Sequence, residues 1–358
     1  MTARLDNVAG KLREEDSFDV EAVDAALKAA LPGLEGFPEV RQFSAGRSNL
    51  TFLLSYPNRD LVLRRPPSGT LPKSGHSMIR EYRVMTALKP VFPAVPNTVY
   101  YADNESSVLG IEFYVMDRVP GLLLNADIPP EWKWSEADVR KFCEGFWDKL
   151  IELHAVDYEA IGLGDFGKPV GYVERQILGW NGRYEKSLTG DADPFEDVRD
   201  WLDANRPATE SGHAIVHGDF RIDNCIVNAD DPFKIDAILD WEISALGDPL
   251  MDLGATLAYW IEAGDPDEMR AGLKQPSDAP GMFTREEVVR YYEKKSGRKV
   301  GDYTFYHVYG IFRLVVISQQ IYYRYYHKQT TNPAYQRMGP SAQRLGQYAR
   351  RLIREGSL

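Results

Sequence analysis

Two short stretches of the sequence carry side chains suited to moving a phosphoryl group from a nucleotide to a hydroxyl. Residues 217–224 read HGDFRIDN, and residues 238–242 read ILDWE. In such chemistry a carboxylate must accept or orient the proton of the attacking hydroxyl, which suits Asp219. An amide oxygen and a second carboxylate must hold Mg²⁺ against the phosphates, which suits Asn224 and Asp240, since Mg²⁺ prefers hard oxygen ligands.

The spacing of these residues makes the pattern specific. Asp219 and Asn224 are five positions apart, the separation between the catalytic Asp and the metal-binding Asn of kinases. Short apolar runs at residues 214–216, 225–227 and 235–239 predict strands, with a turn at residues 229–232. This hairpin would fold Asp240 back toward Asn224. The alternative is that these are solvated turn residues, but residue type, order and spacing together favour the catalytic interpretation.

On these residues the sequence resembles the aminoglycoside phosphotransferase and choline kinase family, small-molecule kinases with the protein-kinase architecture. The segments that match the family are HGD with the following Asn224, DWE at residues 240–242 and GDPLMDL at residues 247–253. The resemblance extends over roughly residues 30–350. It implies Mg²⁺ as the cofactor and ATP or GTP as the phosphoryl donor.

The resemblance and the apolar runs predict an α+β, bilobal protein-kinase-like fold. An N-terminal arm and helix (residues 1–30, loosely ordered through Asp16) precede a small lobe with an antiparallel sheet and one helix (residues 31–118). A larger, mainly helical lobe follows (residues 119–358). The expected strands span residues 39–43, 50–55, 61–65, 99–101 and 111–116. The expected helices span residues 21–31, 77–88, 135–156 (opened by a capping box at Ser135), 172–188, 194–205, 249–263, 284–295 (stopped by Gly297), 303–329 and 341–354.

The resemblance places the nucleotide between the two lobes. In the family fold the hairpin tip after the first strand covers the phosphates, and the strand that leaves the sheet binds adenine through its backbone. The residues that this implies are Gly46, Arg47, Ser48 and Asn49 at the tip, and Met116, Asp117 and Arg118 at the hinge. The tip is poor in glycine, and an ordinary hairpin would look similar.

A kinase of this architecture also needs a cation on the third strand, held by a Glu from the small-lobe helix, to bind the α- and β-phosphates. The third strand offers Arg64, with Arg65 on its opposite face, and the helix offers Glu81. Arg in place of Lys departs from the usual family pattern, but its planar, permanently charged fork can bind phosphate. The alternative is that Arg64 and Glu81 form a surface charge pair.

Other residues are expected to hold the catalytic loop in place. His217 would brace the loop through a hydrogen bond, because Asp219 already holds the position of the base. Asp252 and Asp248 lie near the start of a predicted helix, where the helix dipole favours carboxylates, and would anchor the loop from behind. For His154 we expect a structural role.

The acceptor pocket is expected beside the late helices of the large lobe. The predicted helix at residues 303–329 is rich in aromatic rings and carries no carboxylate, whereas a cationic aminoglycoside would require several carboxylates. The alternative is a core helix with a tyrosine-rich outer face. The acceptor-site candidates are Trp241, Glu242, Tyr309 and Arg313.

Three segments resemble the phosphotransferase domain that some larger proteins carry fused to an acyl-CoA dehydrogenase: LRRPP at residues 63–67, EYRVM at residues 81–85 and YVM at residues 114–116. This resemblance implies an Mg²⁺-dependent kinase that phosphorylates the hydroxyl of a hydroxyacyl-CoA or a hydroxy acid. Two other functions stay open. One is an aminoglycoside or amino-alcohol phosphotransferase with the same chemistry, and the other is a catalytically silent nucleotide-binding regulatory module.

Composition and charge restrict the class of protein. The 358 residues are 44 % hydrophobic and 27 % charged, which is typical of globular proteins, and the net charge of −11 argues against a nucleic-acid partner. Cys143 and Cys225 lie in apolar patterns and are expected to be buried thiols, which suits the reducing cytoplasm. No 18-residue apolar run predicts a membrane span, and the first residues lack the apolar stretch of a signal peptide. Whether the chain forms a homodimer is left open.

Overall fold

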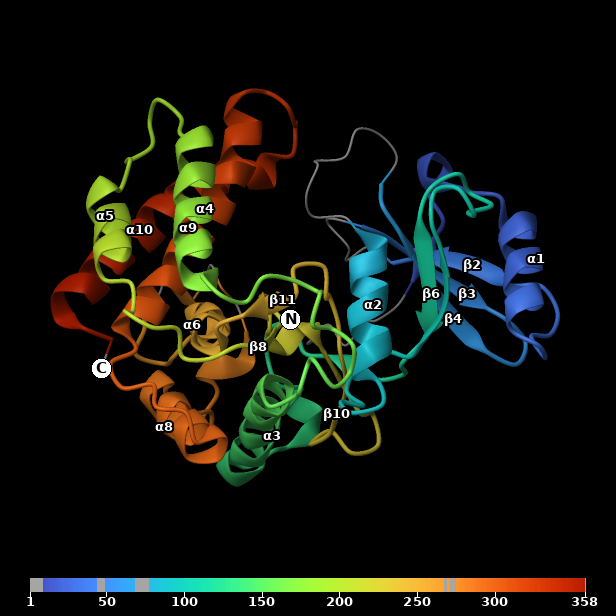
Figure 1. Cartoon of the computed structure of the whole chain (residues 1–358), viewed down its shortest axis with the longest axis horizontal. Helices are drawn as coiled ribbons and strands as arrows, with labels where there is room; N and C mark the ends of the chain where they lie inside the picture. The colour runs from blue at the N-terminus through green and yellow to red at the C-terminus, as the bar shows by residue number, and fades with distance from the viewer. Residues whose placement is uncertain are drawn as a thin grey trace.

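An antiparallel sheet with the strand order β1-β2-β3-β4-β6-β5 forms the framework of the N-terminal lobe, at the right of Figure 1. The computed structural model describes residues 9–43, 49–67, 77–266, 269–270, 273 and 275–357. The strands are β1 (Gly10–Lys11), β2 (Glu39–Gln42), β3 (Leu50–Ser55), β4 (Asp60–Arg65), β5 (Thr98–Ala102) and β6 (Phe113–Asp117). All except β1 are predicted by the sequence to within two residues.

The segment that leads into this sheet is ordered. β1 pairs with β2, and a 3-10 turn, η1 (Glu14–Asp16), follows it. The side chain of Gln42 accepts a hydrogen bond from the Arg13 N–H (3.1 Å) and donates one to Asp16 (2.7 Å). The prediction of a loosely ordered arm is therefore wrong for residues 9–16, because polar contacts tie them to the sheet. Residues 1–8 lie outside the described part of the chain.

The alternation of side chains along β4 decides which residues face the cleft. The helices α1 (Val20–Ala30) and α2 (Met78–Leu88) cover opposite faces of the sheet (Figure 1). Leu61 and Leu63 belong to the core beneath α1, whereas Val62 belongs to the core beneath α2. Since successive side chains of a strand point to opposite faces, Arg64 shares the face of Val62 and points toward α2. Arg65 points to the other face, as predicted.

Helices make up most of the C-terminal lobe, at the left of Figure 1. They are α3 (Glu136–His154), α4 (Tyr172–Lys186), α5 (Glu196–Ala204), α6 (Pro249–Tyr259), α8 (Arg285–Ser296), α9 (Thr304–Tyr326) and α10 (Met338–Glu355). The capping box predicted at Ser135 is present, and Thr284 forms a second one. Gly297, with φ of +71°, ends α8 as predicted. Within the described residues, no helix combines the length and apolar character that a membrane crossing requires.

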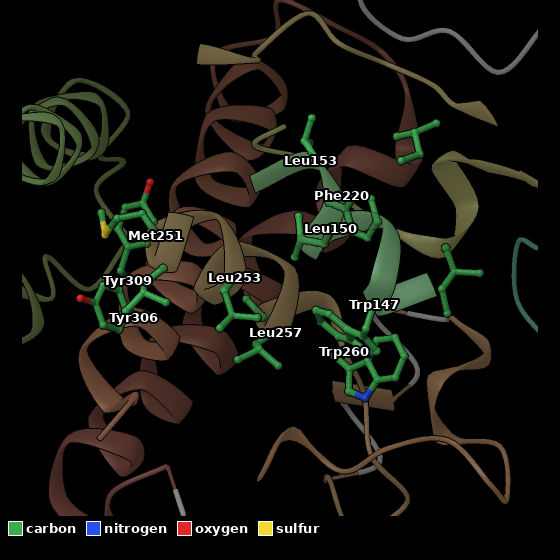
Figure 2. Packing of buried hydrophobic residues seen from close by; sticks show 14 of the residues in the cluster. Trp147, Leu150, Leu153, Phe220, Met251, Leu253, Leu257, Trp260, Tyr306 and Tyr309 are labelled. Carbon is green, nitrogen blue, oxygen red and sulfur yellow. The ribbon is translucent and has the colours of Figure 1, made fainter. Parts of the chain in front are cut away.

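The core of this lobe forms where α3, α6 and α9 meet. Figure 2 shows Trp147 of α3 beside Trp260, next to Leu257 of α6, and all three side chains are buried. α6 and α9 approach so closely that a Cβ on Gly310 would lie 2.2 Å from the Gly254 carbonyl oxygen. Only glycine permits this distance between backbones, so α6 and α9 pack directly against each other at Gly254 and Gly310.

α6 is shorter than predicted. The sequence predicts a helix to Ala263, but α6 ends at Tyr259. Trp260 leaves the helix with an extended backbone, and its indole Nε1 donates a hydrogen bond to the Phe283 carbonyl (2.8 Å). This tertiary contact, rather than a helix-stopping residue, sets the end of α6.

Two small sheets lie between the helices and the cleft. β8 (Ala214–Val216) pairs with β11 (Ala245–Gly247), and β9 (Cys225–Val227) lies between β7 (Leu122–Leu123) and β10 (Ile235–Ile238). The predicted β9–β10 hairpin is confirmed, whereas β7 and β11 are not predicted by the sequence. The short 3-10 segments of the lobe are η2 (Pro130–Trp132), η3 (Ile222–Asn224), η4 (Pro276–Asp278) and η5 (Pro333–Arg337).

Candidate active site

A cleft with about 950 Å³ of empty space, including the part open to solvent, separates the two lobes. One end is lined by aliphatic side chains from both lobes, among them Val62, Leu123 and Ile226. The other end is charged, and its lining residues are Arg64, Glu81, Asp223, Asn224 and Asp240. Such a cleft can hold a flat apolar ring at one end and a polyanion with a cation at the other. The aliphatic end was not foreseen, because short apolar runs do not reveal which of their members face a cleft.

The predicted catalytic loop, residues 217–224, begins where β8 ends, and the side chain of Asp252 in α6 binds its backbone. Asp252 accepts hydrogen bonds from the backbone N–H of His217 (2.7 Å) and of Gly218 (2.8 Å). Although burial opposes its charge, the side-chain hydrogen bond with His154 and the hydrogen bond from the His217 backbone lower the pKa of Asp252. A buried carboxylate therefore fixes the backbone just before Asp219, in the position expected of a brace.

The geometry around His217 assigns its protonation. Its Nδ1 accepts a hydrogen bond from the Asp219 N–H (3.2 Å), so the ring proton resides on Nε2, which donates to the Leu239 carbonyl (3.0 Å). Burial lowers the pKa of His217 despite the carboxylates around it. His217 is thus a neutral imidazole with both nitrogens engaged. Such a ring can brace the loop but has no free nitrogen with which to act as a base.

Aromatic side chains anchor the same loop in the core. Phe220 is buried with its ring centroid 4.6 Å from that of Phe146, and Figure 2 shows it close to Leu150. The indole of Trp241 packs edge-on against His217 at 4.7 Å and donates to the Ile238 carbonyl (2.9 Å). The loop therefore rests on packed rings, which limits its movement.

Asp219 lies at the surface of this anchored loop. Its side chain is 20 % exposed, so one edge can reach a bound molecule. One carboxylate oxygen accepts a hydrogen bond from Asn224 Nδ2 (3.1 Å), and the other lies 3.3 Å from Arg221 Nε. Arg221 also lies 3.4 Å from Asp223, and its guanidinium stacks over Tyr259 at 4.7 Å.

Arg221 and Asp223 were missed by the sequence analysis, although both lie inside the HGDFRIDN motif. Arg221 lies between two carboxylates, and Asp223 lines the cleft. Burial, together with the nearby Asp219 and Asp240, raises the pKa of Asp223, while Arg221 opposes the rise. Their position between Asp219 and Asn224 in the sequence is the only signal that could have singled them out.

The two residues predicted to hold metal meet at the charged end of the cleft. Leu239 N–H donates to the Asn224 carbonyl (2.8 Å), which joins the ends of β9 and β10. Asn224 Nδ2 donates to Asp219, so its Oδ1 points away and accepts no hydrogen bond from the described residues. Asp240 has a φ of +67°, a left-handed conformation that Asp tolerates. An amide oxygen and a carboxylate oxygen are donors of the type that Mg²⁺ prefers, so these residues fit such an ion.

Arg64 lies at the centre of a cluster of carboxylates from both lobes. Its Nε is 3.2 Å from Glu81, and its Nη2 is 2.9 Å from Asp240 and 3.6 Å from Glu242. Burial opposes the charge of Arg64, but these carboxylates outweigh it and raise its pKa. Glu81 also accepts a hydrogen bond from the Tyr114 hydroxyl (2.9 Å). The alternative of a surface charge pair is wrong, because Glu81 is buried in the molecule.

Two acceptor-site candidates lie elsewhere than predicted. Glu242 lies on the nucleotide side, where it accepts a hydrogen bond from Asn49 Nδ2 (3.1 Å) as well as contacting Arg64. Trp241 is only 1 % exposed, so it supports the floor of the cleft. The physical reason is tertiary: Glu242 lies in a turn that follows the left-handed Asp240 and is closed by the Ser244 N–H donating to the Trp241 carbonyl (3.1 Å), and contacts with Asn49 and Arg64 hold its side chain at the N-terminal lobe.

The nucleotide-side predictions are placed as follows. Gly46, Arg47 and Ser48 lie outside the described residues. Met116, Asp117 and Arg118 all line the cleft. However, the N–H groups of Asp117 and Arg118 already donate to the carbonyls of Asn97 (2.8 Å) and Asp60 (3.1 Å). A backbone N–H that donates to a nucleobase would therefore have to belong to another residue that lines the cleft. Val119 is the next such residue along the chain.

Of the two remaining acceptor-site candidates, Arg313 contacts the catalytic loop and Tyr309 lies beside Arg313. Arg313 Nη2 donates to the Gly218 carbonyl (2.8 Å), and the Tyr309 hydroxyl donates to Gln176 of α4 (3.3 Å). Both are buried, and so is most of the first half of α9, whereas the tyrosines near its C-terminus are partly exposed. The alternative of a core helix with a tyrosine-rich outer face is therefore confirmed for α9 as a whole, with Arg313 as a polar exception.

Comparison with known proteins identifies the family to which the chain belongs. The model of the family described as "Phosphotransferase enzyme family" matches residues 39–288. The chain belongs to this phosphotransferase family. It is an enzyme of the class that transfers a phosphoryl group to a hydroxyl acceptor, and its relatives in the family are small-molecule kinases.

This phosphotransferase is similar to proteins of several descriptions. Acyl-CoA dehydrogenase family member 10 of Mus musculus is 33 % identical over 92 % of the chain, which spans only 30 % of the mouse protein. A structure described as a putative aminoglycoside phosphotransferase from Ralstonia eutropha is 32 % identical, with a TM-score of 0.80 over 94 % of this chain and 99 % of that one. Choline kinase from Cryptosporidium parvum, 13 % identical, has a TM-score of 0.61 over 94 % of this chain and 97 % of that chain. The predicted bilobal kinase-like fold is confirmed by these structures.

Proposed function

We propose that this phosphotransferase transfers the γ-phosphoryl group of ATP or GTP to an acceptor hydroxyl with the help of Mg²⁺. The observation that carries the proposal is that Asn224 and Asp240 line a cleft that also has aliphatic walls, while the side chain of Asn224 donates a hydrogen bond to Asp219 beside it. The nucleobase would lie between Val62 and Ile226, with the phosphates toward Arg64. This orientation directs the γ-phosphoryl group toward Asp219.

In the proposed reaction Asp219 orients the acceptor hydroxyl and takes its proton. The acceptor oxygen forms a bond to the γ-phosphorus while the bond from that phosphorus to the bridging oxygen breaks, and its electron pair stays on the nucleoside diphosphate. Asn224 Oδ1 and Asp240 would hold Mg²⁺, which supplies charge neutralisation on the phosphates when bound. Arg64, oriented by Glu81, would bind the phosphates. Most of the rate enhancement would come from positioning and from preorganised charge.

For the acceptor we propose a hydroxyacyl-CoA or a related hydroxy acid. The proposal is supported by the 33 % identity with an acyl-CoA dehydrogenase family member over 92 % of the chain. An aminoglycoside or amino-alcohol acceptor is the second candidate, supported by the likeness to the Ralstonia eutropha structure. However, two arginines lie close to Asp219. Arg221 Nε is 3.3 Å from its carboxylate, and Arg313 donates a hydrogen bond to the carbonyl of the preceding residue, Gly218. Cations in this position disfavour a polycationic acceptor. A silent nucleotide-binding module is disfavoured by the presence of Asp219, Asn224 and Asp240 together.

Nucleotide consumption across an acceptor panel tests the function. The panel contains 4-hydroxyacyl-CoA thioesters, free hydroxy acids, aminoglycosides and choline, each with Mg²⁺ and with ATP or GTP. The Asp219→Asn protein is the blank, and Asp230→Asn, at an exposed position of the β9–β10 turn, is the matched control. Turnover confined to one acceptor class in the wild type and in the Asp230→Asn control supports that acceptor. Tight nucleotide binding without turnover on any acceptor would favour the silent module.

The metal role has a separate test. Asp240→Ala is expected to remove the dependence of nucleotide affinity on Mg²⁺, because it deletes the carboxylate that would hold the ion. Calorimetric titration of ADP with and without Mg²⁺ measures this dependence. An unchanged Mg²⁺ effect in the variant would contradict the assignment of Asp240.

A further inference from the structure

Arg313 is a buried cation without an acidic partner. Its side chain lies in α9 and the residue is 6 % exposed. Its Nη2 donates to the Gly218 carbonyl, but its Nε is buried and has no hydrogen-bond partner. Among the described residues, no carboxylate comes within ion-pair distance of it. Burial opposes the charge of Arg313, while the neighbouring tyrosines and Asp219 favour it and raise its pKa without forming an ion pair with it, so part of its hydrogen-bonding capacity stays unused beside the catalytic loop.

A second arginine shares an aromatic surface with Arg313. The guanidinium of Arg183 lies 4.5 Å from the ring centroid of Trp180, and that of Arg313 lies 5.2 Å from the same ring. Arg183 is exposed on α4 and likewise has no ion pair to a described carboxylate. Gln176 orients the group, since its side-chain oxygen accepts hydrogen bonds from Trp180 Nε1 (3.1 Å) and from the Tyr309 hydroxyl (3.3 Å).

The surrounding sequence supplies no compensating charge. Between Tyr303 and Arg354, which spans α9 and nearly all of α10, the chain has no Asp or Glu, although the whole chain has a net charge of −11. On α4, Glu174 pairs with Arg206 and Glu185 with Arg199. The acidic residues of this helix thus have other partners. Among the described residues neither Arg183 nor Arg313 has an ion-pair partner, so both can pair with a bound anion.

We infer that Arg313, Trp180 and Arg183 form a subsite that binds an anionic group of the acceptor, either a carboxylate or a phosphate ester. The inference rests on the proposed function, because it treats this surface as part of the acceptor site. Arg313 contacts the residue before Asp219, so an anion bound there lies next to the point where the acceptor hydroxyl must be held. Trp180 provides a flat surface between the two cations. The subsite would select acceptors that carry a negative charge near the reacting hydroxyl.

The first test measures anion binding without catalysis. The indole N–H resonance of Trp180, assigned with a Trp180→Phe variant, is followed while inorganic phosphate or acetate is added to nucleotide-free protein without Mg²⁺. We expect a saturable shift, and we expect Arg183→Gln to weaken it about tenfold, as for the loss of one charge-assisted hydrogen bond. The response to phosphate compared with acetate distinguishes the two kinds of anion. Arg183→Lys should retain part of the affinity.

Lys186→Gln is the matched control, because Lys186 is an exposed cation of the same helix that does not stack on Trp180. The absence of a saturable shift with both anions would overturn the inference. Equal weakening in Arg183→Gln and Lys186→Gln would also overturn it, since that result indicates general charge screening. Because this test needs neither nucleotide nor turnover, its outcome is independent of whether the protein proves to be a kinase.

The second test uses turnover. With a pair of acceptors that differ only in an anionic group, 4-hydroxybutanoate and 1,4-butanediol, Arg183→Gln should raise KM for the anion about tenfold and leave kcat unchanged. KM for the neutral diol should not change. An equal effect on both acceptors would overturn the subsite, whereas failure of the wild type to use any acceptor would contradict the proposed function and leave the spectroscopic test to decide the subsite.

Discussion

Two buried arginines flank the catalytic loop, and their surroundings are opposite. Arg64, on the nucleotide side, lies among Glu81, Asp240 and Glu242. Arg313, on the proposed acceptor side, lies among aromatic rings and donates to one backbone carbonyl. The first arginine forms ion pairs within the protein, whereas the second forms none with a described carboxylate. A ligand would have to rearrange the ion pairs of Arg64 before it could bind this arginine. It could bind Arg313 without breaking an ion pair.

The contacts of Arg64 affect how a nucleotide would bind. Arg64 Nη2 contacts Asp240, the carboxylate that we propose as a metal ligand. Binding of Mg²⁺ to Asp240 would compete with this ion pair and make Arg64 available to the phosphates, while Glu81 keeps hold of Nε. Arg suits this exchange better than Lys because its fork can contact several carboxylates at once.

The largest effect is expected from Arg64→Met. This change leaves Glu81 buried without its cation, and breaking a buried ion pair in this way destabilises proteins by about 3–5 kcal/mol. Urea denaturation of the variant and the wild type measures the difference. The double variant Arg64→Met/Glu81→Gln is the control and should recover part of the loss. A decrease below about 1 kcal/mol would mean that the cluster contributes little to the fold.

Asp219→Asn is expected to lower turnover by at least ~10²-fold, the usual scale for a residue that handles a proton in the transition state. The amide keeps the shape of the side chain, so nucleotide affinity should change little. Steady-state kinetics and ADP titration measure the two quantities. Turnover like that of the wild type would rule out the proposed mechanism.

Arg313→Met sharpens the contrast with Arg64. Since no described carboxylate is left without a partner, the free energy of unfolding should fall by no more than about 1 kcal/mol, the net contribution of one hydrogen bond. The free energy of unfolding should rise instead if burying the guanidinium of Arg313 costs more than its hydrogen bond to Gly218 contributes. Urea denaturation beside Arg64→Met checks this. A loss equal to that of Arg64→Met would show that Arg313 is compensated after all.

The smallest effect is expected from Glu242→Gln. Removing a negative charge 3.6 Å from Arg64 leaves that cation less neutralised and lessens repulsion of the phosphates. We expect ADP to bind about two- to fivefold more tightly, the scale of an ion pair near the surface. Calorimetric titration measures the affinity. Weaker binding would instead indicate that Glu242 positions Arg64 for the nucleotide.

Local signals in the sequence predicted many of the structural elements. Ser135 with Asp138 marks the start of α3, and Gly297 marks the end of α8, because capping depends on residues that are neighbours in the chain. β7 and β11 were missed, because each pairs with a strand far away along the chain, β7 with β9 and β11 with β8, and no hairpin pattern in the sequence announces either pairing. The end of α6 was misplaced for a related reason, because a contact between Trp260 and Phe283 determines it.

The residues of the candidate site likewise fall into two groups, those that the sequence could indicate and those whose position only the fold determines. The types and spacing of Asp219, Asn224 and Asp240 are enough to indicate phosphoryl transfer, because the chemistry demands those groups at short separations along the chain. The position of Glu242 could not be predicted, since contacts with Asn49 and Arg64 hold its side chain at the N-terminal lobe. Whether each buried arginine has a carboxylate partner was equally hidden, because Arg64 and Glu242 are 178 positions apart in sequence.

The sequence by itself determined the reaction class and the bilobal fold, and it singled out Asp219, Asn224 and Asp240 as candidates for the site. These follow from short motifs and periodic patterns, whose meaning depends on neighbours in the chain. The tertiary structure alone decided that Arg64 is surrounded by carboxylates while Arg313 lies among aromatic rings without an ion pair to a described carboxylate. Charge compensation depends on distances between segments that are far apart in the chain, and only folding brings those segments together.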